Sequence, residues 1–242
     1  MDLHDKVVIV TGASGGIGLA TATLLAQKGA QVGLAARSEK KLRSLSRKLP
    51  HSLSIPTDMT KPGEIKAMIR QVREHYGRID ILVNNAGQGY DAPIDQTKIR
   101  TFRQIFELDV VGPLIAMQQV IPIMRQQKGG IIINVSSGTA LMSLPNMGAY
   151  SSMKRALANI SLTAREELQS DGIRVSVVYP YITLTDFEEN TIKAGEEEPW
   201  VEDGEGPFFP PDTAEFVAEK ILEGIESGEP EIFAHDWMKN SG

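Results

Sequence analysis

Short apolar runs alternate with amphipathic segments along most of the chain. Residues 6–11 form a β-branched apolar run, which is typical of a strand buried on both faces. The spacing of apolar positions over residues 19–26 predicts a helix that ends at Gly29, and residues 31–36 give a second strand. The same order continues, with strands predicted at 52–56, 79–83, 130–135, 173–178 and 231–234, and helices at 38–48, 62–76, 97–127 and 148–169.

This alternation predicts an α/β fold. We expect a single-domain, doubly wound, mostly parallel Rossmann-like sheet of about seven strands, with helices on both faces. The 242 residues suit one such domain, spanning 1–242, and no repeat or linker divides them. Residues 186–212 are acidic and rich in Pro and Gly, so we expect a mobile substrate loop at about 182–210. Pro113 and Pro122 predict kinks in the helix at 97–127.

Composition narrows the class of protein. The net charge of −6 argues against a nucleic-acid partner or an anionic membrane surface. The absence of cysteine excludes disulfides, thiolate catalysis and cysteine-based metal sites, and the four histidines show no metal-ligand spacing, so no metal site is predicted. We find no targeting segment and no run of about 18 apolar residues, which makes a cytoplasmic protein without a membrane partner the expectation.

A glycine-rich turn, GASGGIG, occupies residues 12–18, between the first strand and the first helix. Glycines let the backbone turn tightly, so that N–H groups at a helix start can meet a pyrophosphate without interference from Cβ atoms. A glycine cluster alone is usually only a turn. In a strand–turn–helix–strand setting of about thirty residues it favours dinucleotide binding.

The segment YSSMK places Tyr150 and Lys154 four residues apart, on one face of the predicted helix 148–169. A nearby ammonium favours the phenolate and lowers the phenol pKa from its usual value of about 10. Such a pair is also common on solvated helix faces, so it is weak evidence alone. Ser137 lies thirteen residues before Tyr150, just after the strand 130–135.

The carboxyl ends of parallel strands meet at one edge of a sheet, where ligands bind. Several of the notable features follow strands directly and should therefore gather at this edge. These features are the glycine turn, Arg37, Asp58, residues 84–87, Ser137 and residues 181–185.

The motifs TGASGGIG at 11–18, NNAG at 84–87, Ser137, Tyr150-x-x-x-Lys154 and the turn at 180–185 occur together in this order. Over nearly its whole length the chain thus resembles the short-chain dehydrogenase/reductase family. The resemblance implies an NAD(P)(H)-dependent oxidoreductase that interconverts a carbonyl and an alcohol on a small-molecule substrate. It also implies a homodimer or homotetramer, paired through the long helices at 97–127 and 148–169.

The resemblance assigns roles to individual residues. Tyr150 would be the general acid/base, with its pKa lowered by Lys154 and by the oxidised nicotinamide, and Lys154 would also bind the nicotinamide ribose. Ser137 would hold the substrate oxygen, with Ser136 as the alternative. The implied cofactor-binding residues are Gly12, Ser14, Gly16, Ile17, Gly18, Arg37, Asp58, Asn85, Ala86, Gly87, Tyr150, Lys154, Pro180 and Thr185.

The residues after the second strand bear on coenzyme choice. NAD-preferring members usually carry an acidic residue there, whereas this chain has Ala36 followed by Arg37. A guanidinium pairs with a 2′-phosphate that a carboxylate would repel, so we predict NADP(H) over NAD(H). Asp58 resembles the family's adenine-contacting Asp, and a helix N-terminal cap is an equally good interpretation.

Two positions depart from the family pattern. Asp109 stands where the family has its fourth active-site residue, an Asn, and a buried carboxylate near Lys154 would hold the ammonium charge more firmly, at a desolvation cost. Tyr181 stands where the family usually has Gly, and it either narrows the pocket over the nicotinamide or points outward.

Other interpretations stay open at this stage. A non-catalytic dinucleotide-binding redox sensor would have the same fold, but it has no need of a proton donor. Dehydration or epimerisation on a bound cofactor would call for larger C-terminal elements than this chain has. Met142, Leu144 and Met147 either line a substrate pocket or fill the core. The acidic residues from 188 to 205 either are a solvated loop or attract a basic substrate.

Overall fold

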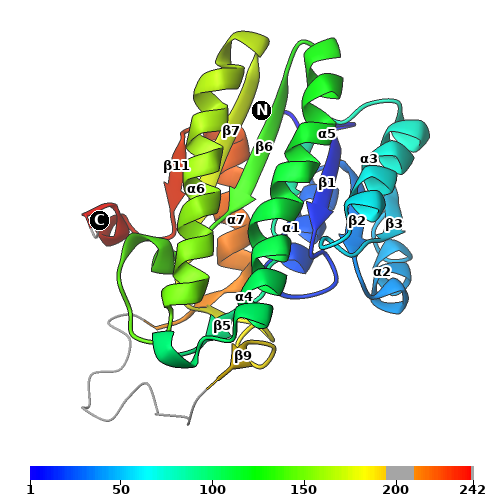
Figure 1. The fold of residues 1–242 in the computed structure, drawn as a ribbon. Helices are drawn as coiled ribbons and strands as arrows, with labels where there is room; N and C mark the ends of the chain where they lie inside the picture. The colour runs from blue at the N-terminus through cyan, green and yellow to red at the C-terminus, as the bar shows by residue number, and fades with distance from the viewer. Residues whose placement is uncertain (195–209, 241–242) are drawn as a thin grey trace.

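The structure is a computed structural model that describes residues 1–194 and 210–240. Its centre is a sheet of seven parallel strands in the order β11-β7-β6-β4-β1-β2-β3 (Figure 1). The predicted doubly wound parallel sheet is confirmed. The strands of the sheet are β1 (Val7–Thr11), β2 (Gln31–Ala36), β3 (Ser52–Pro56), β4 (Ile81–Asn84), β6 (Gly130–Val135), β7 (Ile173–Tyr179) and β11 (Glu231–Phe233).

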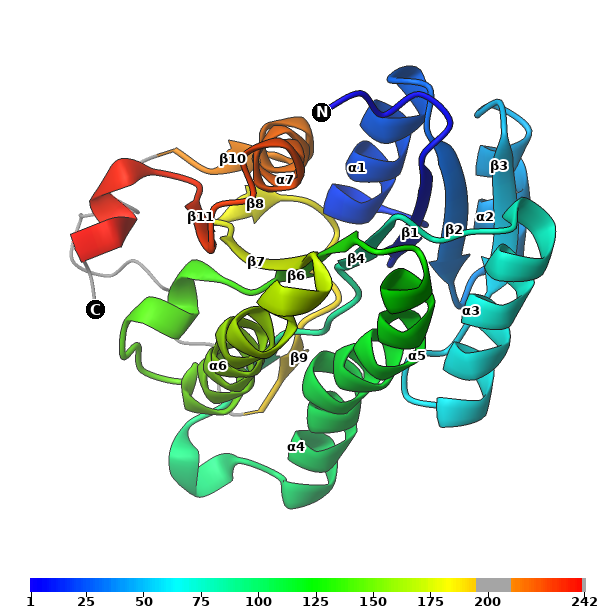
Figure 2. The same ribbon diagram turned by 90° about the horizontal axis from the view of Figure 1, so that it is seen from above.

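Helices cover both faces of the sheet, as the view from above shows (Figure 2). One face carries α1 (Gly16–Gln27), α2 (Glu39–Ser46) and α7 (Ala214–Ser227), and the other carries α3 (Pro62–Tyr76), α4 (Ile99–Phe106), α5 (Gly112–Gln126) and α6 (Gly148–Leu168). The structure also has short 3₁₀ helices: η1 (Ile94–Gln96), η3 (Gly138–Leu141), η4 (Gln169–Asp171) and η5 (Asp236–Asn240).

The apolar strand residues divide between two cores because successive side chains of a strand point to opposite faces. In β1, Val8 and Val10 join the core beneath α1, α2 and α7, while Val7 and Ile9 join the core beneath α3 and α5. All of these side chains are fully buried, as the continuous apolar run at 6–11 predicts for a strand covered on both faces.

The helix predicted over 97–127 is present, but it is not α-helical throughout. A π-helical turn, Glu107–Val111, lies between α4 and α5, and Pro113 follows it in the first turn of α5. Pro122 lies inside α5. By length and composition Ile99–Gln126 could cross a membrane, but Met117 and Val120 pack in the core under the sheet, so it is a core helix of this domain.

The segment after β7 is partly ordered by short parallel strand pairs. β8 (Thr183–Leu184) pairs with β10 (Asp212–Thr213), and β9 (Ile192–Lys193) pairs with β5 (Tyr90–Asp91). The first part of the loop predicted at about 182–210 is therefore tied to the rest of the domain, and residues 195–209 lie outside the described residues. The apolar pattern did not predict α7, which packs beside α1 on the sheet (Figure 2).

Candidate active site

A buried ion pair joins two elements at the carboxyl edge of the sheet. Lys154 on α6 and Asp109 in the π-helical turn have exposed side-chain fractions of 4% and 0%, and the ammonium lies 3.1 Å from Asp109 Oδ2. The backbone N–H of Gln88 donates to Asp109 Oδ1 at 3.0 Å, and Lys154 Nζ donates to the carbonyl of Val135 at 3.3 Å. The wider π-helical turn carries Asp109 into the interior, so the predicted neighbourhood of Asp109 and Lys154 is present.

Gly87 leaves the space that this pair occupies. A Cβ added at Gly87 would lie 3.0 Å from both Asp109 Oδ2 and Lys154 Nζ. Any larger residue would push one of the two charges aside. The last glycine of the NNAG motif is thus packed tightly against the ion pair.

Tyr150 lies one helical turn before Lys154, with 6% of its surface exposed. Lys154 Nζ is 5.7 Å from the centre of its ring, and the Ser137 side chain is close enough to lower the pKa of its hydroxyl. Ser137 Oγ itself accepts hydrogen bonds from the N–H of Thr139 at 3.2 Å and from Thr139 Oγ1 at 3.0 Å. Since its acceptor positions are occupied by Thr139, the Ser137 hydroxyl hydrogen is free to be donated toward Tyr150 or a substrate oxygen. Ser136 instead donates to the Lys154 carbonyl at 2.9 Å and supports α6.

The pKa of the Tyr150 phenol differs in direction from the sequence-based expectation. Burial raises this pKa, and the Asp109 carboxylate raises it further, while Lys154 and the hydrogen bond from Ser137 lower it. The balance in the coenzyme-free protein is a raised pKa, because desolvation outweighs the ammonium. Burial alone would lower the pKa of Lys154, but the charges of Asp109 and Tyr150 raise it. Burial also raises the pKa of Asp109, against the pull of Lys154.

The glycine turn is fixed by contacts with the loop after β4. Thr11 Oγ1 accepts from the backbone N–H groups of Asn85 and Ala86 at 2.9 and 3.0 Å, and the Asn85 side chain donates to the Thr11 carbonyl at 2.9 Å. A Cβ on Gly18 would lie 2.3 Å from the Gly12 carbonyl oxygen, and Gly12 has a left-handed φ of 71°. The predicted glycines are thus required by backbone contact, and the loop carrying Asn85 and Ala86 lies beside them.

The start of α1 has the features of a pyrophosphate site. The helix begins at Gly16, its N-cap Gly15 makes no side-chain capping bond, and its first turn has no acidic residue. The first N–H groups therefore carry the partial positive charge of the helix terminus without a side-chain partner. Thr185 closes the opposite side, since a Cβ on Gly16 would lie 3.1 Å from its methyl group. This cradle fits the phosphates of a dinucleotide, with Ser14 half-buried in the turn and Ile17 packed against the core below.

Arg37 and Asp58 lie close enough to interact at the ends of β2 and β3. Arg37 is exposed. Burial alone would raise the pKa of Asp58, but hydrogen bonds from Thr60 and the charges of Lys61 and Arg37 lower it. Asp58 Oδ1 accepts from the Thr60 N–H at 2.9 Å, which forms a turn ahead of α3, whereas the N-cap of α3 is Lys61. Asp58 therefore orders the approach to the helix and does not occupy its cap position.

Tyr181 packs in a C-terminal aromatic cluster, which comprises Tyr181, Phe216, His235 and Trp237. Its ring meets those of His235 and Trp237 edge-on, at centroid distances of 5.8 and 5.5 Å. His235 Nε2 lies 3.0 Å from both carboxylate oxygens of Asp212. The substitution at the usual glycine position thus anchors the start of the segment after β7. Pro180 accepts a hydrogen bond from the N–H of Gly138 at 2.7 Å and so lies against the turn of Ser137.

A buried polar chain beneath the site was not predicted from the sequence. Asn84 Nδ2 donates to Asn134 Oδ1 at 2.8 Å, and Asn134 Nδ2 donates to Ser161 Oγ on α6 at 2.7 Å. These bonds tie β4, β6 and α6 together below the ion pair. In the sequence, this polar chain is indicated by Asn134, a side-chain amide within the otherwise apolar run of β6.

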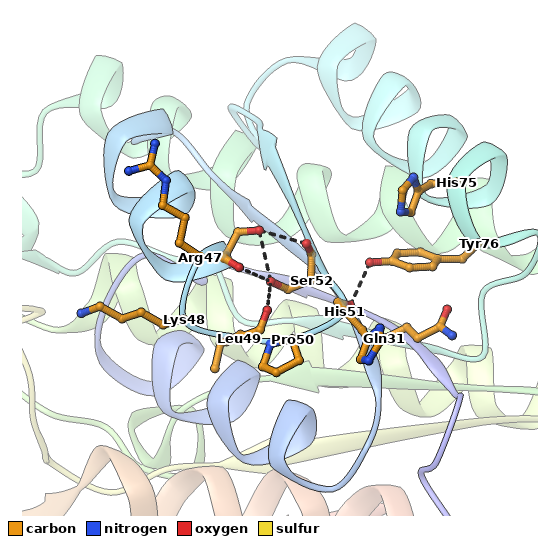
Figure 3. A pocket seen from close by; sticks show the side chains of 10 residues that line it. Gln31, Arg47, Lys48, Leu49, Pro50, His51, Ser52, His75 and Tyr76 are labelled. Atoms are coloured by element: carbon orange, nitrogen blue, oxygen red, sulfur yellow. Dashed lines mark hydrogen bonds between the residues drawn. The ribbon is translucent and has the colours of Figure 1, made fainter.

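A cavity of about 580 Å³ lies at the opposite edge of the sheet, near the amino ends of β2 and β3 (Figure 3). Its wall is closed by hydrogen bonds of Ser52 to Ser46 and Leu49, and by the Tyr76 hydroxyl, which donates to the His51 carbonyl at 2.9 Å. Ser52 and Gln31 begin their strands, whereas Tyr150, Lys154 and the glycine turn lie where strands end. This cavity therefore lies away from Tyr150 and Lys154, and the polar side chains at the carboxyl edge define the candidate active site.

Comparison with known proteins agrees with this geometry. The short chain dehydrogenase family matches residues 6–196. An uncharacterized oxidoreductase of Staphylococcus saprophyticus is 36% identical over 190 residues, which cover 77% of each chain. The crystal structure of a short-chain dehydrogenase from Streptomyces avermitilis has a TM-score of 0.88 and 28% identity, and covers 100% of this chain and 92% of its own.

A doubly wound nucleotide-binding fold with a Ser–Tyr–Lys site defines the class of protein. The chain belongs to the short-chain dehydrogenase family of oxidoreductases, whose members bind a nicotinamide dinucleotide. A further short-chain dehydrogenase/reductase, from Burkholderia phymatum, has a TM-score of 0.87, 23% identity and coverage of 100% and 92%, and its structure contains NAD.

Proposed function

We propose that the protein is an NADP(H)-dependent oxidoreductase that interconverts a carbonyl and an alcohol on a small molecule. The observation that carries this proposal is the buried contact of Tyr150 with Ser137 and Lys154 at the same sheet edge as the uncapped start of α1. A redox sensor without catalysis would have no need of a proton donor such as Tyr150 beside the buried Lys154 ammonium.

Each residue of the site has a defined task in this proposal. The bound coenzyme supplies or accepts the hydride, and the start of α1, Asn85, Thr185 and Lys154 would hold it. Ser137 donates its free hydroxyl hydrogen to the substrate oxygen, where negative charge develops during reduction. Tyr150 gives its proton to that oxygen in reduction and takes it back in alcohol oxidation. Asp109 keeps Lys154 protonated, and the ammonium in turn lowers the cost of the phenolate.

The role of Tyr150 is tested by Tyr150→Phe. Loss of the proton donor should lower kcat by about 10²–10⁴-fold, while coenzyme affinity changes little. Tyr179→Phe is a matched control, because Tyr179 is also a buried tyrosine and its hydroxyl bonds Glu231 on the neighbouring strand. Normal turnover in Tyr150→Phe, or an equal loss in Tyr179→Phe, would remove Tyr150 from the mechanism.

Coenzyme preference is tested by comparing kcat/KM for NADPH and NADH. Arg37 is exposed just after β2, where its guanidinium would give a 2′-phosphate a charge-assisted contact. Arg37→Ala should lower kcat/KM for NADPH by about 10- to 100-fold and leave the NADH value nearly unchanged. Arg43→Ala on α2 is the control, since Arg43 pairs with Glu39 on the same helix. A preference for NADH in the unmodified enzyme would contradict the assignment, and the NAD-containing relative makes this a real alternative.

We also propose a cytoplasmic homodimer or homotetramer. The family resemblance supports pairing through the outer faces of the α4–α5 stretch and α6, where Ile99 and Phe106 are exposed apolar side chains. Light scattering after gel filtration measures the mass directly, and a monomer at micromolar concentration would contradict this assignment.

A further inference from the structure

Phe187 lies at the place where a substrate must approach Tyr150. It belongs to the segment 182–194, which the β8–β10 and β9–β5 pairs hold across the carboxyl edge of the sheet. The Phe187 ring is 5.9 Å from the ring of Tyr150, tilted by 52°. Its other neighbour is the backbone at Gly89, where an added Cβ would lie 3.1 Å from Phe187 Cε1.

The Phe187 ring packs against neighbouring residues on one side and is partly exposed to solvent. The Thr191 side chain also packs against Gly89, and the Gln88 side chain donates a hydrogen bond to the Asn190 carbonyl. These contacts hold the backbone near Gly89 and the backbone near Phe187 together. Phe187 nevertheless keeps 39% of its surface exposed. A phenyl ring held this way offers a flat apolar surface next to the catalytic phenol.

The surroundings of Phe187 combine apolar side chains with negative charge. Ile94, which is 77% exposed, reaches Gly148 at the start of α6, two residues before Tyr150, and Met147 is half-buried at the same place. Phe187 itself stands among three exposed carboxylates, Asp186, Glu188 and Glu189. The only cation of the segment 182–194, Lys193, acts on Asp91.

We propose that Phe187 determines substrate specificity, and that the substrate is an uncharged carbonyl compound with an apolar body that packs on the Phe187 ring. The inference rests on the proposed function and deepens it. An apolar body gains from contact with the ring, whereas an anionic substrate meets the repulsion of three carboxylates at low ionic strength.

Binding to the enzyme saturated with oxidised coenzyme tests this proposal without turnover, because a ketone cannot react in that complex. The probes are methyl 4-acetylbenzoate, which is uncharged, and 4-acetylbenzoate, which differs by one carboxylate. Ligand-observed NMR gives both dissociation constants. We expect the ester to bind about tenfold more tightly at low salt.

Three variants separate the ring from the charge. Phe187→Ala should weaken ester binding by about tenfold and Phe187→Leu by less, while Leu184→Ala, on an exposed apolar residue of the same segment, should stay within about twofold. The double variant Glu188→Gln, Glu189→Gln should reduce the ratio of the two dissociation constants by about threefold.

The outcomes distinguish this inference from the proposed function. Tight ester binding that depends on Phe187, with no reduction of its ketone group by reduced coenzyme, would support the pocket and count against the proposed reaction. Equal or tighter binding of 4-acetylbenzoate, no binding of either probe, or no effect of Phe187→Ala would overturn the inference, even if the enzyme reduces other carbonyl compounds.

Discussion

Replacement of Asp109 by Asn tests how the buried ion pair controls the proton of Tyr150. Asp109 Oδ2 lies 3.1 Å from Lys154 Nζ, which is 5.7 Å from the Tyr150 ring centre, so the carboxylate is within about 9 Å of the ring. At an effective dielectric constant of about 20, a unit charge at this distance raises the free energy of the phenolate by about 2 kcal/mol. Removing the charge should therefore lower the pKa of Tyr150.

The sign of the kinetic effect follows from the direction of these shifts. Alcohol oxidation needs the phenolate, so its rate rises with pH through the pKa of Tyr150, which burial and Asp109 raise. In Asp109→Asn this rise should occur at a lower pH. The variant also loses the Asp109 carboxylate, which raises the pKa of Lys154. Lys154 should therefore lose its proton at a lower pH, so the rate should fall again at an alkaline pH where the unmodified enzyme is still active.

The assay is the pH dependence of kcat for alcohol oxidation at saturating coenzyme, with coenzyme affinity measured at each pH. Asp80→Asn is the matched control. Asp80 is also a buried carboxylate in an ion pair, with Arg78, but it accepts from the Val7 N–H at the amino end of the strands. This control should lose about 1–3 kcal/mol of stability and keep its pH profile. An unchanged profile in Asp109→Asn, or the same displacement in Asp80→Asn, would refute the reasoning.

The remaining predictions concern the supports of the site. Gly18→Ala places a Cβ 2.3 Å from the Gly12 carbonyl oxygen. We expect the free energy of unfolding, measured with denaturant, to fall by about 2–3 kcal/mol, and coenzyme binding to be weak. Normal coenzyme affinity would contradict this packing. Thr11→Val removes the acceptor of two loop N–H groups and should cost about 2–4 kcal/mol, with a weaker coenzyme complex in titration. Tyr181→Ala should raise the substrate KM more than it lowers kcat, because the C-terminal aromatic cluster anchors the segment after β7; a pure kcat effect would contradict that role.

Strand and helix patterns determined most of the fold in advance. Residues 7–10 must be covered on both faces because all four side chains are apolar, and this requirement favours a parallel sheet between two helical layers. The helix predicted at 97–127 is present over Ile99–Gln126, but the apolar spacing did not indicate its π-helical turn at Glu107–Val111. No helix was predicted for the residues of α7.

The sequence by itself also determined which residue types meet at the carboxyl edge, because strand ends of a parallel sheet converge whatever the loops do. Only the tertiary structure decided how these residues interact. It buried Asp109 against Lys154 and raised the pKa of Tyr150, since desolvation depends on the surroundings in three dimensions. It also packed the Tyr181 ring against His235 and brought the Phe187 ring to 5.9 Å from the ring of Tyr150. Such contacts between distant segments are not encoded by periodicity along the chain.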